Sequence, residues 1–249
     1  MKDLVLLPGW GFDARVWQPL AKLLAKDFRI HATTESLPAG VDAVVCGWSL
    51  GALTAMQAAL NQPEKIARLF LIGATPRFVQ SPDWPHGQPP GLLDSFAAAV
   101  AADPRTALRR FAALLNQGDD ESRRLTRELT AALASDTSPA TLAAGLDILR
   151  DTDLRQQVNR IRQPVLLLHG ARDALIPLAA AEWLLEHLPD ARLEVFPGTA
   201  HAVFLAQPER CAQLLASFAY GPTPQTFASP GSPLKGQETL GTARRVSDE

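Results

Sequence analysis

The stretch VVCGWSLGAL, residues Val44–Leu53, places a serine between two glycines, after an apolar run and before an alanine-rich one. Serine favours neither a strand nor the interior of a helix. The flanking glycines would let the chain turn sharply from strand to helix, with Ser49 held in a strained, exposed conformation at the turn. This arrangement is typical of a nucleophile elbow, G-x-S-x-G. Because the bare pattern also occurs by chance in ordinary glycine-flanked turns, the rest of the chain must decide.

Composition excludes several classes of protein. The 249 residues suffice for one large domain, or one domain with an insertion, and a hydrophobic content of 47% allows a sizeable core. A net charge of −2 argues against a nucleic-acid binder or an anionic-membrane binder. Cys46 and Cys211 lie far apart in apolar surroundings, which suits buried thiols in a reducing compartment. The N-terminal apolar run is too short for a signal peptide and no run could span a bilayer, so we expect a cytoplasmic protein.

Short apolar runs that end in glycine or proline alternate with helical stretches along the chain. The runs are Leu4–Pro8, Ala43–Trp48, Ala67–Gly73, Pro164–Gly170 and Ala191–Gly198. The helical stretches are Val16–Lys26, Leu50–Asn61, Leu178–Leu188 and Glu209–Phe218. Four of the runs are almost wholly apolar, as expected of parallel strands buried on both faces. The pattern predicts an α/β fold with a mostly parallel sheet flanked by helices.

One segment interrupts this alternation. Between about residues 92 and 158 no strand is evident, and four helical stretches follow one another, with breaks or caps at Asp103-Pro104, Gly118-Asp119 and Ser138-Pro139. We therefore expect a core of residues 1–90 and 159–220, interrupted by a helical cap at 91–158. The tail 221–249 is rich in Pro, Gly, Ser and Thr, and we expect it to be disordered.

A serine hydroxyl becomes a good nucleophile only beside a base, which in turn needs an orienting acid. Asp173, in HGARDALIP, and His201, in PGTAHAVF, each follow a predicted strand, in the order Ser-Asp-His. The competing interpretation is a pair of unrelated, solvent-exposed loop residues; the order and the placement favour a triad. His169 immediately precedes the acid loop and is interpreted as structural.

Stabilising an oxyanion requires two further hydrogen-bond donors. The backbone N–H of Leu50, directly after the serine, is one candidate. The N–H of Trp10, in the early loop Pro8–Gly11, is the other, although that loop could also be an ordinary tight turn. Trp10 and Trp48 would in addition give the pocket apolar walls.

These segments together carry a family resemblance. The chain resembles α/β-hydrolases and, more narrowly, the pimeloyl-[acyl-carrier protein] methyl ester esterase family of biotin biosynthesis. Across residues 4–220 the resemblance rests on the segments VLLPGWGFDARVW, CGWSLGAL, SPDWP, LDILRDTDLRQ, HGARDALIP and AHAVFLAQPE. Two features depart from the family: Pro8 replaces its usual histidine, and residues 28–48 leave hardly any room for the helix found there in most α/β-hydrolases. From the second departure we expect a thinner sheet flank and a pocket that is more open on that side.

The resemblance implies a serine esterase that releases methanol from the methyl ester of pimeloyl-acyl-carrier protein. We expect it to act as a monomer, without metal or organic cofactor. It implies Ser49 as nucleophile with Asp173 and His201 completing the triad. It implies substrate contacts at Trp10, Ser49, Leu50, Phe111, Ala112, Ala113, Leu114, Leu115 and His201. It also implies that cap arginines hold the acidic carrier protein, and the positions that match are Arg110, Arg123 and Arg127.

Two alternatives stay open on the sequence. A general short-chain carboxylesterase or a C–C bond hydrolase would use the same triad on other small molecules. A non-catalytic small-molecule receptor would retain the fold and the pocket, although an intact triad argues against it. For the arginines, a solvated helix face with internal ion pairs is the competing interpretation, because the same segment carries almost as many acids.

Overall fold

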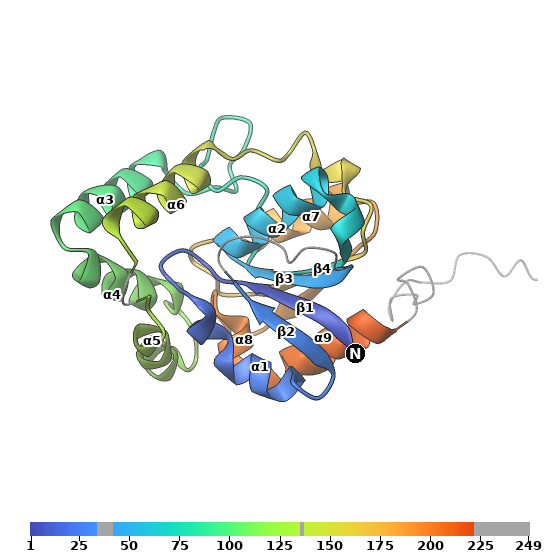
Figure 1. Cartoon of the computed structure of the whole chain (residues 1–249). Helices are drawn as coiled ribbons and strands as arrows, with labels where there is room; N and C mark the ends of the chain where they lie inside the picture. Colours follow the sequence, from blue (N-terminus) through green and yellow to red (C-terminus); the bar gives the residue numbers. More distant parts are fainter. Residues whose placement is uncertain (34–41, 135–136, 222–249) are drawn as a thin grey trace, which may run out of the picture.

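The computed structural model describes residues 1–33, 42–134 and 137–221. Its centre is a six-stranded sheet in the order β2-β1-β3-β4-β5-β6 (Figure 1), with every neighbouring pair parallel. The strands are β1 (Lys2–Leu7), β2 (Phe28–Ala32), β3 (Ala43–Trp48), β4 (Ile66–Ile72), β5 (Val165–Gly170) and β6 (Ala191–Phe196). The predicted α/β alternation is confirmed, and the tail 222–249 lies outside the described residues.

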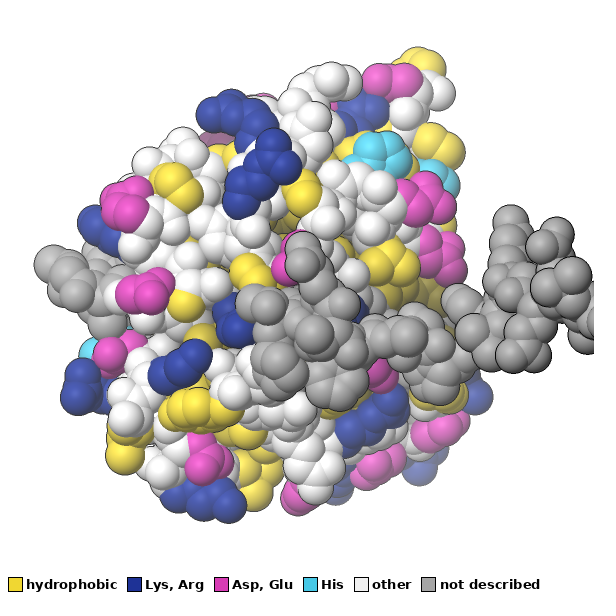
Figure 2. All heavy atoms as spheres, turned by 90° about the vertical axis from the view of Figure 1, so that its right-hand side faces the viewer, with side chains coloured by type: hydrophobic (Ala, Val, Ile, Leu, Met, Phe, Trp, Pro, Cys, Tyr) yellow, Lys and Arg dark blue, Asp and Glu magenta, His cyan; other side chains and the backbone are white. Residues whose placement is uncertain are grey.

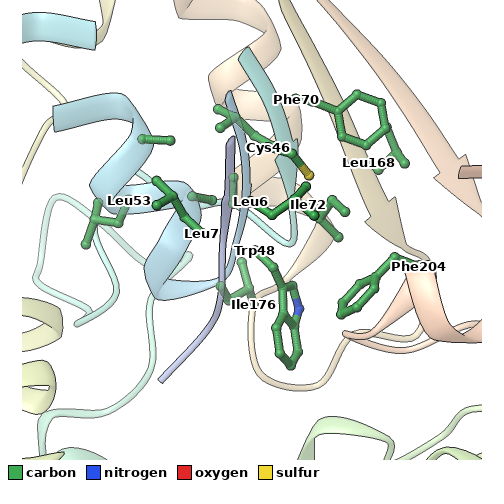
Figure 3. Close-up of a cluster of buried hydrophobic side chains, with 14 of the residues drawn as sticks. Leu6, Leu7, Cys46, Trp48, Leu53, Phe70, Ile72, Leu168, Ile176 and Phe204 are labelled. Carbon is green, nitrogen blue, oxygen red and sulfur yellow. The ribbon is translucent and has the colours of Figure 1, made fainter. Parts of the chain in front are cut away.

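Burial on both faces explains why the central strands are almost wholly apolar. All six residues of β3 and of β5 are buried, whereas the edge strands β2 and β6 are only partly buried. Figure 3 shows the core that results, in which Cys46, Phe70 and Leu168 pack between the sheet and its helices. Both cysteines are buried free thiols, and burial raises the pKa of Cys211 to about 12.

Helices cover both faces of the sheet. On one face lie α2 (Leu50–Asn61) and α7 (Leu178–His187), and on the other lie α1 (Gln18–Leu24), α8 (Val203–Ala206) and α9 (Pro208–Tyr220) (Figure 1). Helix α2 packs closely on β3 through Ala52, Ala55 and Ala59, which are buried and too small to hold the helix away from the sheet. Short 3-10 turns, Ala14–Trp17, Pro63–Lys65 and Val158–Arg160, lead into α1, β4 and β5.

Four further helices lie together beside the carboxyl ends of the strands (Figure 1). They are α3 (Pro90–Ala102), α4 (Pro104–Leu115), α5 (Ser122–Ala131) and α6 (Pro139–Asp151). Two of them begin at side-chain caps: Asp103 accepts from the N–H of Thr106, and Ser138 accepts from that of Thr141. Helix α3 packs on α4 and α6, and α4 packs on α5, so these helices form one layer over the strand ends.

The face opposite this layer carries basic and acidic side chains side by side (Figure 2). This mixture fits the small net charge of the chain and is typical of a solvated surface. Among the described residues no helix is long and apolar enough to cross a membrane.

Candidate active site

Ser49 stands at the turn between β3 and α2, where it is only 8% exposed, so the expectation that it is exposed is wrong. Its backbone has φ 58° and ψ −119°, and it is the one non-glycine residue with a positive φ in the described part of the chain. The glycines on either side are required by space: a Cβ at Gly47 would collide with the carbonyl oxygen of Gly51, and a Cβ at Gly51 with that of Leu7. The N–H of Ser49 donates to the carbonyl of Ile72 at 2.9 Å, which ties the turn to β4. The sequence pattern thus corresponds to a strained backbone held by the sheet.

Asp173 and His201 come together from two loops that follow β5 and β6. Nδ1 of His201 lies 2.6 Å from Oδ2 of Asp173, and both side chains are fully buried. The other oxygen, Oδ1, accepts from the N–H groups of Leu175 and Ile176, each at 2.9 Å. The carboxylate is therefore fixed by three donors, and it orients the imidazole through Nδ1.

The electrostatics of this pair keep the acid ionised. Burial alone would raise the pKa of Asp173, but His201, together with the donors around the carboxylate, brings it below its ordinary value. A second histidine, His169, has its Nε2 3.6 Å from Oδ2 of Asp173 and 2.8 Å from the carbonyl of Ile176. Because a carbonyl only accepts, Nε2 of His169 carries the proton, and burial lowers the pKa of this imidazole. His169 thus supports the acid loop, in keeping with the structural role expected for it.

The second ring nitrogen of His201, on the edge opposite Asp173, forms no hydrogen bond with a described residue. This nitrogen, Nε2, is buried. Trp48 donates from Nε1 to the carbonyl of His201 at 3.1 Å, and the two ring centroids are 5.5 Å apart. Trp48 is fully buried and packs beneath the loop 197–202, which carries His201 and is called the histidine loop below. Trp48 therefore supports His201 and does not line the cavity beside Trp10. The free Nε2 is the one atom of this ring that can exchange a proton with a substrate.

The loop after β1 lies directly beside the serine. A Cβ at Gly9 would stand 3.3 Å from Cβ of Ser49 and 3.0 Å from Cε3 of Trp48, so a larger residue here would crowd both side chains. Trp10 is buried and donates from Nε1 to the carbonyl of Leu142 at 2.8 Å. Its ring meets that of Phe111 edge-on, with the two ring centroids 4.9 Å apart. Its side chain therefore links the loop after β1 to helices α4 and α6. Its backbone N–H has no partner among the described residues, and the N–H of Leu50, at the first position of α2, has none within its helix.

A cavity of about 410 Å³ opens beside these two residues. It lies between the loop 7–13, the first turn of α2 and helix α6, and its wall includes Trp10, Leu50 and Gly145. A Cβ at Gly145 would stand 2.6 Å from Cδ1 of Trp10, so glycine there allows α6 to pack against the indole. The lining is mainly apolar and includes Gly51 and Leu50 next to Ser49, but neither Ser49 nor His201 itself. In the described part of the chain no cluster of His, Cys, Asp or Glu could hold a metal ion.

Known proteins resemble this chain in both sequence and fold. The family model of the alpha/beta hydrolase fold matches residues 39–208. The chain is 44% identical to the pimeloyl-[acyl-carrier protein] methyl ester esterase of Aromatoleum aromaticum, over 88% of this chain and 98% of the relative. It is 37% identical to the enzyme of the same name from Nitrosomonas europaea, over 84% of this chain and 92% of the relative. The chain belongs to the pimeloyl-[acyl-carrier protein] methyl ester esterase family.

Solved structures agree on the fold. An esterase from Exiguobacterium antarcticum superposes with a TM-score of 0.75 at 22% identity, covering 88% of this chain and 91% of that one. A hydrolase from Oleispira antarctica superposes with a TM-score of 0.77 at 19% identity, covering 89% of this chain and 92% of that one. The expectations of an α/β-hydrolase fold and of a hydrolase are confirmed for this member of the esterase family.

The cap segment 111–115 of this esterase family member is divided between two sides of helix α4. Phe111 and Leu115 are buried toward the core, and Ala112 is fully buried with them. Ala113 and Leu114 instead line a separate, outward-facing cavity of about 860 Å³. Of the five cap residues expected to touch substrate, the structure brings Phe111 against Trp10 and Leu115 against the histidine loop, where its carbonyl accepts from the N–H of His201 at 3.1 Å.

The three arginines expected to hold a carrier protein surround that outward cavity. Arg110 comes from α4, and Arg123 and Arg127 come from α5, one turn apart. All three are exposed and form no salt bridge with any described residue. Arg124 differs, because it pairs with Glu121 at 2.5 Å and with Glu128 at 2.7 Å. Internal ion pairing therefore applies to Arg124, while these three arginines stay available.

Sequence reasoning missed several residues around the site. Gly73, with φ +54°, lies against the ring of His201, and Asp119 is a buried carboxylate next to the histidine loop. Gly73 could have been noticed, because it directly follows β4 at the edge of the sheet where Ser49 stands. Nothing in the sequence distinguishes Asp119 from the two acidic residues that follow it.

Proposed function

We propose that this chain hydrolyses the methyl ester of pimeloyl-acyl-carrier protein and releases methanol, a step of biotin biosynthesis. The observation that carries the proposal is the buried Asp173–His201 pair beside the strained Ser49 turn, in a chain whose relatives are named for this reaction. We place the reaction in the cytoplasm, an assignment supported by the two buried free thiols.

The reaction proceeds through an acyl-enzyme. Oγ of Ser49 attacks the ester carbonyl while Nε2 of His201 takes its proton, and Asp173 stabilises the imidazolium that forms. The N–H groups of Leu50 and Trp10 stabilise the oxyanion; losing one such donor costs roughly 10²- to 10³-fold in kcat. His201 then gives its proton to the methoxide, which leaves as methanol. Water, deprotonated by His201, attacks the acyl-enzyme and releases the free acid and the serine hydroxyl.

The outward cavity between α4 and α5 suits an acidic carrier protein. Arg110, Arg123 and Arg127 line it together with Ala113 and Leu114, so it combines three available cations with an apolar floor. Guanidinium groups offer paired donors to carboxylates and phosphates, which an acidic carrier protein with a phosphorylated arm would present. We propose this surface, defined by the three arginines, as the carrier-protein site.

The first test is direct turnover. The purified protein is incubated with methyl-pimeloyl carrier protein, and mass spectrometry follows loss of the methyl group from the carrier. We expect complete conversion by the wild type. A chain that hydrolyses p-nitrophenyl esters but leaves the carrier substrate intact would be a general carboxylesterase, and failure on both would favour a non-catalytic receptor.

The second test separates docking from chemistry. Replacing Arg110, Arg123 and Arg127 with alanine should raise KM for the carrier substrate at least tenfold and leave a small free ester almost unchanged, and the difference should shrink with added salt. The matched control replaces Arg105, Arg109 and Arg162, which are also exposed and without a salt bridge among the described residues. Equal losses on both substrates, or an equal effect of the control, would reject the carrier site.

A further inference from the structure

The loop that joins α4 to α5 lies against the loop that carries His201. Three consecutive acids occur in it, and two of them, Asp120 and Glu121, are exposed. Asp119, in contrast, is only 8% exposed. A carboxylate enters a protein interior at a considerable cost unless donors surround it, so its burial requires an explanation.

The carboxylate of Asp119 is bound at both oxygens. Oδ2 accepts from the backbone N–H of Ala200 at 2.8 Å, in a buried contact. Oδ1 accepts from the N–H of Glu121 at 2.8 Å, within its own loop. Ala200 immediately precedes His201, so one carboxylate joins the cap loop to the residue beside the proposed catalytic base.

Further contacts hold the same two loops together. The carbonyl of Leu115 accepts from the N–H of His201 at 3.1 Å, and the carbonyl of Gly198 accepts from the N–H of Asp120 at 3.1 Å. Arg172, next to the catalytic acid, donates from Nη1 to the carbonyl of Gly118 at 3.1 Å. Three of these contacts reach the histidine loop from the cap. Asp119 contributes a charged side chain, whereas the contacts of Leu115 and Asp120 use backbone groups.

We infer that Asp119 is a positioning residue for His201. Its carboxylate fixes the backbone at Ala200, and this keeps the imidazole in its 2.6 Å contact with Asp173, with Nε2 free. Removing the carboxylate leaves the N–H of Ala200 buried without its partner, so the loop must shift to find another. The base would then lose its orientation although every triad residue is still present. The inference rests on the proposed serine mechanism but not on the carrier substrate.

The test uses a small p-nitrophenyl ester, so it does not depend on the carrier-protein proposal. Asp119→Ala should lower kcat by about 10²-fold, as a misplacement on the order of 1 Å does, with KM nearly unchanged. Asp119→Asn keeps the size and one acceptor oxygen, so its loss should be smaller. The matched control is Asp147→Asn, which removes an exposed cap carboxylate paired with Arg150 and touches no part of the histidine loop.

A second background distinguishes positioning from general damage to the fold. In His201→Ala, Asp119→Ala should cause no further loss of the residual activity, because the residue acts through the histidine. A purely structural role predicts the same fold-loss in both backgrounds, and that result would overturn the inference. Wild-type kcat in Asp119→Ala would also overturn it. If Asp119→Ala fails to fold, the same comparison is made with Asp119→Asn, whose melting temperature is measured first.

Discussion

Replacing Gly73 with alanine should damage the site through a single methyl group. Gly73 follows β4 with φ +54°, and a Cβ there would stand 2.7 Å from Cε1 and 2.8 Å from Nδ1 of His201. Ordinary contact between such atoms begins near 3.4 Å, so the imidazole must move by about 0.7 Å. The 2.6 Å hydrogen bond from Nδ1 to Asp173 would lengthen toward the limit of a useful bond.

Two effects, one on stability and one on activity, follow from this geometry. The left-handed backbone costs alanine roughly 1–2 kcal/mol in stability, which lowers the melting temperature by only a few degrees in a chain of this length. The misplaced base, by contrast, should lower kcat/KM by about 10- to 100-fold, since on the order of 1 Å of displacement costs that much. A loss of a few degrees leaves the protein folded at temperatures well below the melting transition, so the fall in activity there reports the misplaced imidazole and not unfolding.

The assay measures kcat/KM on a small p-nitrophenyl ester at a temperature well below the melting transition, and calorimetry gives the stability. Gly91→Ala is the matched control, because a Cβ there meets nothing within 4 Å and the residue lies in helix α3. That control should keep wild-type activity. If Gly73→Ala also keeps wild-type kcat/KM, the base does not need its position against Gly73, and the geometric reasoning about the site is refuted.

Two further predictions concern the nucleophile and the second buried histidine. Ser49→Ala should lower kcat by roughly 10⁴- to 10⁶-fold without unfolding, and a covalent serine inhibitor should add its mass at Ser49; labelling of another serine contradicts this. In the folded chain burial lowers the pKa of His169. In the unfolded chain the same imidazole is exposed and protonates below about pH 6.5. The unfolded chain then binds more protons, so stability is lost as pH falls, by at most about 1.4 kcal/mol per pH unit for this group. His169→Gln should reduce the fall in melting temperature between about pH 7 and pH 5; an unchanged slope would count against the buried neutral imidazole.

The fold was predictable because its signals are local and repeated. Strands β1, β3, β4 and β5 are apolar on both faces, and such runs are hard to mistake when each is followed by a helix. The parallel order also brings the strand ends to one edge, which is why loops distant in sequence could be expected to meet there. Helix α8 was not predicted, because a four-residue helix has no period to detect.

The directions of individual side chains were harder to predict from the sequence than the fold. Helix α4 turns Phe111 and Leu115 toward the core but Ala113 and Leu114 toward the outward cavity, so five consecutive residues cannot share one role. The helical period could have separated them. Trp48 was expected to form a wall of the pocket but lies beneath His201, which depends on how the strand faces the histidine loop. The burial of Asp119 depends on a tertiary contact with Ala200, and no local pattern encodes it.

The α4–α5 hairpin presents different chemistry on its two sides. Outward, it offers Arg110, Arg123 and Arg127 around an open cavity. Inward, it holds the histidine loop through the carbonyl of Leu115 and the carboxylate of Asp119.

Its second helix is also tied to the core, because Arg124, which pairs with Glu121 and Glu128 of the same hairpin, donates to the carbonyl of Leu205 in α8 at 3.3 Å. A hairpin held in this way offers a preformed surface to the proposed carrier protein. Changes on the outer side should then alter KM for the carrier substrate, and changes on the inner side should alter kcat for every ester. An outer variant that lowered kcat on a small ester would show that docking and chemistry are coupled through this hairpin.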